Sequence, residues 1–198
     1  MGVFVANNEA PTLKSDAIDI NTPSVLVLEL EYLMRSGDMG ALDRLIKGAR
    51  ANCPIMVSAG DKRASYTYEW TASGMKRRSG DRDGMLVTTN HFTHPSWNRP
   101  AVSPGSYVMT LERRANLLSL GEKNRGKFNV QKMKDVLGVT VDKGGATHAG
   151  KTTFQIIIVP GELMMYVKIP DLQDWTDFDL KIPLTRYVLA GDAEFSVQ

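Results

Sequence analysis

The residues that could do chemistry in this chain gather at the end of one apolar, β-prone segment, Thr88-Thr-Asn-His-Phe92. A strand that ends at Asn90 would place a side-chain amide at the rim of a sheet, where acyl-transfer sites need hydrogen-bond donors for a developing oxyanion. Asparagine is also a frequent turn former at the end of a strand. The segment by itself therefore leaves two interpretations open, a donor for acyl transfer and a plain turn.

The histidines and the single cysteine are further candidates. His91 and His94 are three residues apart, but they lie in a proline-rich stretch without a nearby carboxylate, which disfavours a metal site. Cys53 lies between a helix and an apolar strand, where a cysteine usually behaves as a small buried apolar residue. An alternative is a thiol enzyme that combines Cys53 with one of the three histidines, His91, His94 or His148. We expect no metal and no cofactor, because the common phosphate-loop, zinc and serine-nucleophile motifs are absent from the sequence.

Composition and charge restrict the class of protein. Residues 1–198 are 42% hydrophobic and 23% charged, and these values are typical of a single soluble globular domain. A net charge of +2 is too small to favour nucleic acid or an anionic membrane as a partner. Apolar runs such as 156–159 are far shorter than the roughly 20 residues of a membrane-spanning helix. No signal peptide follows Met1, so we expect a cytoplasmic protein if Met1 is the true start.

The first half of the sequence predicts a strand, a helical hairpin and an antiparallel meander. Thr22 and Pro23 are typical of a helix start, and Asp38 can cap a second helix. From Ile55 the apolar period changes from helical to alternating. The basic run Lys76–Arg78 is interpreted as a solvated strand end without a binding role. The expected elements are a strand at 2–6, a helix at about 23–36, a second helix that closes at 52–54, and strands at 55–59, 65–70 and 85–89.

The second half predicts a long loop, two helices and a hairpin. The loop at 91–105 contains three prolines, and because loops of this length are often functional it is a candidate wall of a site. Pro160 and Gly161 would form the turn of the hairpin. Segregated helices and meandering strands favour an α+β layered fold over a doubly wound parallel sheet. The expected elements are helices at about 107–120 and 130–137, paired strands at 152–159 and 163–169, and an edge strand at 175–182 that Pro183 ends.

Three segments resemble, in order, the motifs of one enzyme family. Gly2-Val-Phe-Val-Ala-Asn-Asn-Glu9 is similar to a Gly-Leu-x-Val-x-x-Asn motif, and Gly84-Met-Leu-Val-Thr-Thr-Asn-His-Phe92 is similar to a Thr-Asn-His motif. Thr110-Leu-Glu-Arg113 is similar to the start of a Ser-x-x-Arg-x-x-x-Leu helix. The family is the isopenicillin-N acyltransferase-like cysteine peptidase family of N-terminal-nucleophile (Ntn) hydrolases. Segments 152–158 and 175–180 also resemble its closing strands, so the likeness covers nearly all 198 residues.

This resemblance implies a fold and a mechanism. The implied fold is part of an αββα four-layer sandwich with mainly antiparallel sheets, here as an incomplete domain. In the family, autoproteolysis frees an N-terminal cysteine whose α-amine acts as a base, and an acyl-enzyme forms on its thiol. By resemblance, Asn90 would supply an oxyanion-hole amide, and Asn8, or its neighbour Asn7, would lie near the nucleophile. Arg113 would either organise the site or form a salt bridge at a helix start, and Glu69 is expected to be structural.

The sequence departs from the family at two places. The family's cysteine lies upstream of the Gly-Leu-x-Val-x-x-Asn motif, whereas this chain begins at that motif, and Cys53 lies in the wrong place to replace it. Some relatives carry an arginine just before a Gly-x-Thr strand, where this sequence reads Thr147-His-Ala-Gly150. Substrate binding therefore need not be that of the penicillin enzyme.

These departures lead to two hypotheses. The first is a later portion of an amidase or acyltransferase that acts on small acyl-amide substrates and is inactive alone. Its partner would be a complementing Cys-led chain or a second copy, because a missing first part would leave sheet edges and apolar faces exposed. The second is a non-catalytic binding or scaffold protein derived from the same fold.

Overall fold

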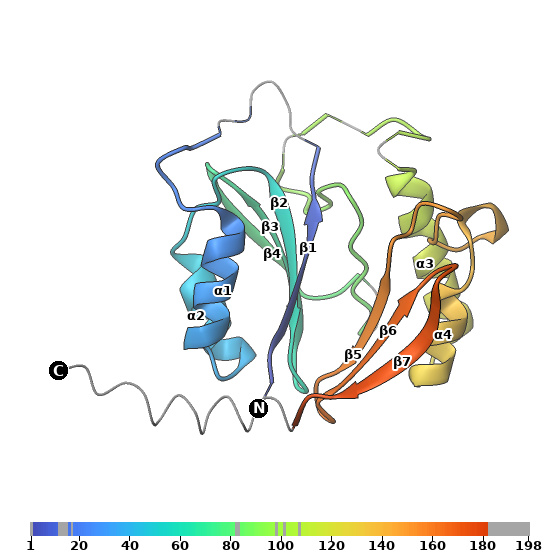
Figure 1. Ribbon diagram of the computed structural model, residues 1–198. Helices are drawn as coiled ribbons and strands as arrows, with labels where there is room; N and C mark the ends of the chain where they lie inside the picture. Colours follow the sequence, from blue (N-terminus) through green and yellow to red (C-terminus); the bar gives the residue numbers. More distant parts are fainter. Residues whose placement is uncertain are drawn as a thin grey trace.

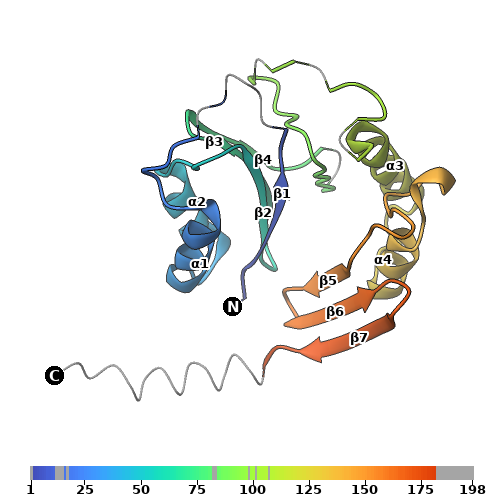
Figure 2. The ribbon, with the colours of Figure 1, turned by 45° about the horizontal axis from the view of Figure 1, so that its top comes forward.

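The computed structural model describes residues 2–11, 16, 18–81, 84–97, 99–100, 102–106 and 108–181. The elements follow the order β1 (Phe4–Glu9), α1 (Val25–Arg35), α2 (Met39–Lys47), β2 (Ile55–Gly60), β3 (Ser65–Thr71), β4 (Gly74–Arg78), α3 (Thr110–Lys123), α4 (Val130–Leu137), the short 3-10 helix η1 (Val141–Lys143), β5 (Gln155–Val159), β6 (Met164–Ile169) and β7 (Gln173–Asp179). They form two antiparallel sheets, with strand orders β1-β2-β3-β4 and β5-β6-β7. In Figures 1 and 2 the sheets lie between two helix pairs, α1 with α2 and α3 with α4. The predicted mixture of helices and antiparallel sheets is confirmed.

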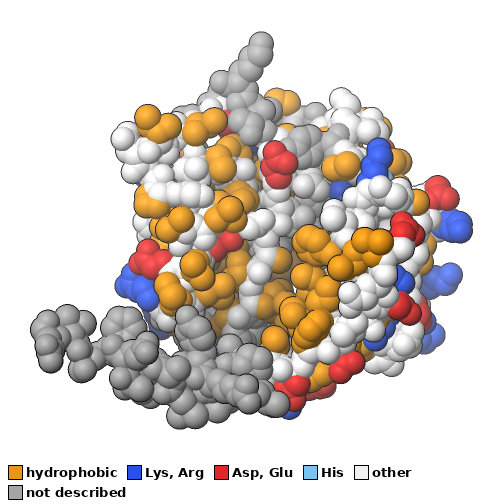
Figure 3. All heavy atoms as spheres, in the orientation of Figure 1, with side chains coloured by type: hydrophobic (Ala, Val, Ile, Leu, Met, Phe, Trp, Pro, Cys, Tyr) orange, Lys and Arg blue, Asp and Glu red, His pale blue; other side chains and the backbone are white. Residues whose placement is uncertain are grey.

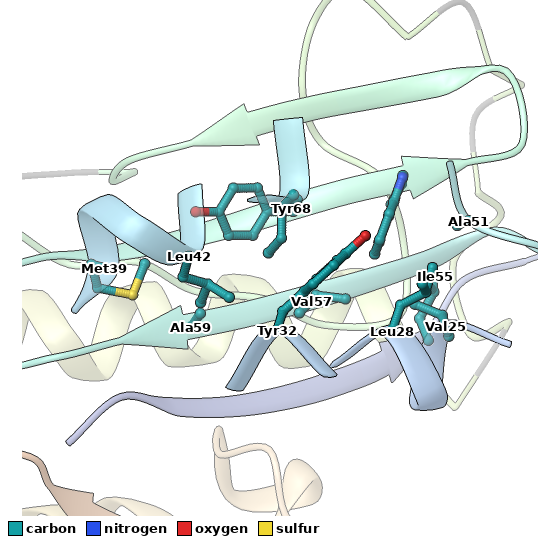
Figure 4. Close-up of a cluster of buried hydrophobic side chains, with 12 residues drawn as sticks. Val25, Leu28, Tyr32, Met39, Leu42, Ala51, Ile55, Val57, Ala59 and Tyr68 are labelled. Carbon is teal, nitrogen blue, oxygen red and sulfur yellow. The ribbon is translucent and has the colours of Figure 1, made fainter. Parts of the chain in front are cut away.

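The hydrophobic core lies between the first sheet and the α1–α2 hairpin (Figure 4). In the register of β2 and β3, Val57 pairs with Tyr68 and Ile55 pairs with Trp70, so these four side chains share one face of the sheet. Each fully buried side chain of this kind contributes about 1.5–3 kcal/mol. The helices meet this face with apolar residues at helical spacing, which are Val25, Leu28 and Tyr32 of α1 and Met39, Leu42 and Ile46 of α2.

The two helices begin in different ways. The Asp38 carboxylate accepts a hydrogen bond from the Ala41 N–H at 2.8 Å, which confirms the predicted cap of α2. Thr22 does not cap α1, because its hydroxyl donates to Asp19 at 2.7 Å. The first N–H of α1 donates instead to Oδ1 of Asn52 at 3.1 Å. A residue that lies 27 positions along the chain thus supplies this cap.

The second sheet packs against α4. The ammonium of Lys134 on α4 lies 4.8 Å from the ring centre of Tyr166 on β6 and 5.6 Å from that of Trp175 on β7. Ile157 pairs with Tyr166, so it shares the face that α4 covers. Its neighbour Ile156 therefore points to the opposite face, and 44% of Ile156 is exposed.

The structure corrects the position of one strand. The strand beside β3 is β4, at 74–78, whereas the residues predicted as a strand at 85–89 form none. A tight turn at Ala72 and Ser73 returns the chain directly onto β3, and Gly74 takes a φ of 153° that favours glycine. The run Lys76–Arg78 is thus the end of a paired strand. Arg77 is exposed, as expected for a solvated strand end, whereas Arg78 is buried, so that interpretation is wrong for Arg78.

Several other predicted boundaries move by a few residues: the strand predicted at 2–6 is β1 at 4–9, the second helix ends at Lys47 before the predicted 52–54, and the strand predicted at 152–159 begins at Gln155. Helix α3 starts at Thr110 because Val108 and Met109 adopt left-handed backbone angles, with φ of 52° and 53°. The last strand, β7, occupies 173–179, and its predicted end at Ile182 lies outside the described residues. No helix in the described part of the chain is long and apolar enough to cross a membrane.

Candidate functional site

The segment 87–94 crosses the face of the first sheet that is opposite to the α1–α2 hairpin. The hydroxyl of Thr88 lies 2.6 Å from that of Thr67 on β3, and Ser58 on β2 donates to it at 3.3 Å. The hydroxyl of Thr89 donates to the Thr110 carbonyl at 3.0 Å, which ties the segment to the start of α3. The segment is therefore held between the sheet and α3, with Asn90 at its centre.

Asn90 is bonded at both ends of its amide. Its Nδ2 donates to the carbonyl of Glu9, at the end of β1, at 2.9 Å. Its Oδ1 accepts from Nη1 of Arg113 at 3.0 Å. The structure thus brings together two of the three residues that sequence analysis singled out, Asn90 and Arg113, beside the end of β1.

Arg113 is half-buried, and burial lowers the pKa of its guanidinium from the ordinary value. Nη1 also donates to the Val108 carbonyl at 3.3 Å, while the buried Nε has no hydrogen-bond partner among the described residues. Among the described residues Arg113 has no ion pair, and the salt bridge near the start of α3 is made by its neighbour Arg114 with Asp81. Its contact is with the Asn90 amide.

The two adjacent asparagines of β1 point to opposite faces. Asn7 donates to the Glu29 carboxylate of α1 at 3.0 Å, on the helix side of the sheet. Asn8 lines a cavity of about 400 Å³ together with Ser58 and Thr88, on the side of the 87–94 segment. The alternation of a strand therefore separates them and puts Asn8, not Asn7, on the face that carries Asn90.

Arg78 is the functional candidate that sequence analysis missed. Its side chain is 8% exposed, and its Nε donates to the fully buried Glu69 carboxylate at 2.9 Å. Glu69 also accepts from the backbone N–H of Thr93 at 2.7 Å and of His94 at 3.0 Å. The sequence gives no clear signal for this pair, because Glu69 lies directly opposite Lys76 in the register of β3 and β4, and Arg78 reaches it only diagonally.

The histidines have separate partners. Nδ1 of His91 lies 2.8 Å from the Thr110 hydroxyl, and burial lowers the pKa of His91. Nδ1 of His94 lies 2.8 Å from the Ser96 hydroxyl. Nε2 of His148 lies 3.1 Å from the Val108 carbonyl, which also accepts from Arg113. Within the described ranges, no cluster of three or more histidine, cysteine, aspartate or glutamate residues could hold a metal.

Cys53 does not have the surroundings of a nucleophile. Its thiol contacts Oδ1 of Asn52 at 3.7 Å, and burial raises the pKa of Cys53, with a further rise from the charge of Glu9. A raised pKa reduces the fraction of the thiolate, which is the reactive form. The geometry therefore gives no support to a thiol enzyme built on Cys53.

The predicted site wall at 91–105 is packed by its own side chains where it is described. The rings of Phe92 and Trp97 stack at 5.2 Å, and Arg99 lies 4.8 Å from the Phe92 ring centre. Arg99 also forms an ion pair with Asp16 at 2.7 Å. These contacts order the loop that follows Asn90, and its role as a wall stays a prediction.

An apolar groove lies between the two sheets. Its volume is about 710 Å³, and it lies between the edge strands β1 and β5. Figure 3 shows hydrophobic side chains on both sides of this groove. Its lining is Phe4, Val5 and Ala6 of β1, Ile156, Ile157, Ile158 and Val159 of β5, the segment 128–130, Met133 and Glu162. A second apolar cavity of about 450 Å³ shares Phe128 and Met133 with it.

The fold is similar to that of a solved bile acid hydrolase. One variant of the conjugated bile acid hydrolase from Clostridium perfringens matches with a TM-score of 0.56 over 91% of this chain and 71% of that chain, at 12% identity. A second variant of the same enzyme matches with a TM-score of 0.56 over 91% and 70%, at 11% identity. No protein-family model and no curated protein matches the sequence. At this identity the likeness shows that the two chains share a fold and no more.

Proposed function

We propose that this chain is the later portion of an isopenicillin-N acyltransferase-like amidase or acyltransferase, which cleaves acyl-amide C–N bonds through an acyl-enzyme. The observation that carries the proposal is the Asn90 amide, held between Arg113 and the end of β1 within an Ntn-hydrolase fold. The helix pairs on either side of the two sheets further support extending the fold to an αββα sandwich. The substrate class is small acyl amides, linear or cyclic.

In this mechanism Asn90 donates to the oxyanion. An amide NH₂ has two hydrogens, so the Glu9 carbonyl takes one and the other can point to the substrate. The guanidinium of Arg113 fixes Oδ1, which prevents rotation of the amide and polarises its N–H bonds. Asn8, on the same face of the sheet, serves as the second donor or positions the nucleophile.

The nucleophile comes from a Cys-led chain that adds to the β1 edge. In the described structure β1 pairs on one side only, with β2, and β5 pairs only with β6. Unpaired strand edges beside an apolar groove accept an added strand through backbone hydrogen bonds. The thiolate attacks the carbonyl carbon, the amine leaves with a proton from the α-ammonium, and water or a second amine then takes the acyl group.

The test is amide cleavage by the purified chain, alone and with a Cys-led segment added, on acyl-amino acid and penicillin-type substrates. We expect amine release and an acyl adduct on the added cysteine only in the mixture. Turnover by the chain alone would show that its nucleophile is already present. A dimer that excludes the Cys-led segment would show that a second copy occupies the β1 edge.

The second candidate function is non-catalytic binding by a protein derived from this fold. The observation that favours it is the apolar groove of about 710 Å³ between β1 and β5, which can hold a ligand without any nucleophile. Calorimetry with an acyl amide separates the two functions. Binding without turnover, with or without the Cys-led segment, would support the binding protein and contradict the amidase.

A further inference from the structure

We infer that the buried Glu69–Arg78 pair is a positioning device for Asn90 and Arg113, and this inference rests on the proposed function of that site. The pair touches neither Asn90 nor Arg113. It binds the backbone on both sides of Asn90, and through Asp81 it reaches the helix that carries Arg113.

Downstream of Asn90 the anchor is the Glu69 carboxylate, which is fully buried in the middle of β3. Oε1 accepts the Thr93 N–H at 2.7 Å and the Thr93 hydroxyl at 3.0 Å. Oε2 accepts the His94 N–H at 3.0 Å. The chain that leaves Asn90 is therefore fastened to a strand of the rigid first sheet, three and four residues after the amide.

Upstream of Asn90 the anchor is Arg78, together with Asp81. Nη2 of Arg78 donates to the Val87 carbonyl at 3.2 Å and to the Thr88 hydroxyl at 3.4 Å. Nη1 donates to Asp81 at 3.0 Å, and the other carboxylate oxygen of Asp81 accepts the Val87 N–H at 2.7 Å. Both polar groups of the Val87 backbone are thus held by this pair of side chains.

The same network extends to helix α3. Arg114 forms an ion pair with Asp81 at the oxygen that also accepts from Arg78. Arg113 is the next residue on α3, so the network sets the position of the helix turn from which its guanidinium reaches Asn90. A single chain of ion pairs therefore connects the backbone on both sides of Asn90 with the turn of α3 that carries Arg113; its members are Glu69, Arg78, Asp81 and Arg114.

The segment 87–94 needs hydrogen bonds from side chains because it lies outside both sheet ladders. An irregular segment without a ladder has backbone N–H groups that must find other partners when buried. Charged side chains supply stronger and more directional hydrogen bonds than neutral ones. Glu69 and Arg78 come from paired strands, so they transfer the rigidity of the β3–β4 hairpin to the loop that holds Asn90.

The first test is hydrogen exchange of the chain as it exists, in Glu69→Gln. This variant keeps an oxygen acceptor but removes the charge. We expect exchange of the backbone amides at 87–94 to rise by about tenfold or more, while the amides of β2 keep their protection. The matched control is Glu29→Gln, a half-buried carboxylate on α1 that binds Asn7, and it should leave 87–94 unchanged. Unchanged exchange at 87–94 in Glu69→Gln, or an equal rise over the whole chain, would overturn the inference.

The second test is Arg78→Lys, which keeps the positive charge but cannot bind Val87, Asp81 and Glu69 at once. We expect the side-chain NH₂ resonances of Asn90, assigned by their loss in Asn90→Asp, to shift and broaden. Should Glu69→Gln fail to fold, this spectrum decides the inference, and unchanged Asn90 resonances would contradict it.

A third measurement, of kcat and KM, distinguishes the positioning of Asn90 from a general stabilisation of the fold. In the chain complemented with the Cys-led segment, Arg78→Lys should lower kcat by about tenfold with KM within about twofold, because the oxyanion forms only in the transition state. A loss confined to KM would contradict the positioning role. Absence of turnover in the unmodified mixture would refute the proposed function and leave the exchange and resonance results as the test of the network.

Discussion

The two sheets of this molecule differ in how well they bury their own side chains. Val57, Tyr68 and Trp70 of the first sheet are fully buried against the α1–α2 hairpin. All six residues of β6 are only partly buried, and Ile157 is the one buried hydrophobic residue described in β5, β6 and β7. The first sheet thus buries one face, whereas the second leaves apolar side chains such as Ile156 exposed. The site around Asn90 lies on the first sheet.

The sharpest test of this difference compares a tryptophan in each sheet. Trp70→Ala should lower the free energy of unfolding by about 3–5 kcal/mol, because it empties a core site and removes the Trp70 hydrogen bond to Ala49. Trp175→Ala, on β7, should cost only about 1 kcal/mol, mostly from its contact with Lys134. Urea unfolding followed by circular dichroism gives both values. Equal losses would mean that the second sheet is as well packed as the first.

The next largest effect concerns the proposed chemistry. In the chain complemented with a Cys-led segment, Asn90→Ala should lower kcat by about 10²–10³, as expected for the loss of one oxyanion donor. The matched control is Asn116→Ala on α3, whose amide donates to the Gly145 carbonyl and should leave kcat unchanged. Single-turnover kinetics measure both. Equal effects of the two variants would remove Asn90 from the chemistry.

The third prediction compares two aspartates by the pH dependence of the stability that each contributes. Burial alone would raise the pKa of Asp43, but hydrogen bonds from three donors outweigh it and lower the pKa. The donors are Lys47, Arg77 and Tyr68. A carboxyl with a lowered folded pKa stabilises the fold above its unfolded pKa of about 3.9, and this stabilisation is lost as the pH falls through the folded pKa.

Asp43→Asn should therefore lower the free energy of unfolding by about 1–2 kcal/mol at pH 7, and the difference from the parent should shrink near pH 3. Asp174 in the second sheet also has a lowered pKa, chiefly from the Trp175 backbone N–H, but it is fully exposed. Asp174→Asn should change the pH dependence of the free energy of unfolding less than Asp43→Asn does. Unfolding titrations at several pH values would show a constant difference if Asp43 were not linked to stability.

The smallest effect compares two helix caps. Asp38 caps α2 of the first half, and Asn129 caps α4 of the second by accepting the Lys132 N–H at 2.8 Å. Asp38→Ala should cost about 1 kcal/mol of global stability. Asn129→Ala should instead increase hydrogen exchange in the first turn of α4, with a smaller global change, because that half is more loosely packed. A larger loss of global stability in Asn129→Ala than in Asp38→Ala would contradict the looser packing of the second half.

Local features of this protein could be predicted from its sequence. The predicted helix at 130–137 matches α4, and the cap at Asp38 and the hairpin of β5 and β6 are found where expected. Helical period, capping side chains and Pro-Gly turns act over a few residues, so a single sequence contains them. The Asn90 segment was also found in the sequence, because a polar amide after an apolar run is a local pattern.

The tertiary structure decided which segment pairs with β3 and what surrounds Asn90. The sequence predicted the next strand at 85–89, whereas the backbone pairing of the whole sheet selects 74–78. The partners of Asn90 lie 81 and 23 residues away, at Glu9 and Arg113, and the buried charge of Arg78 is compensated across a strand pair. Such contacts depend on how distant segments meet in space, and no short pattern in the chain encodes them.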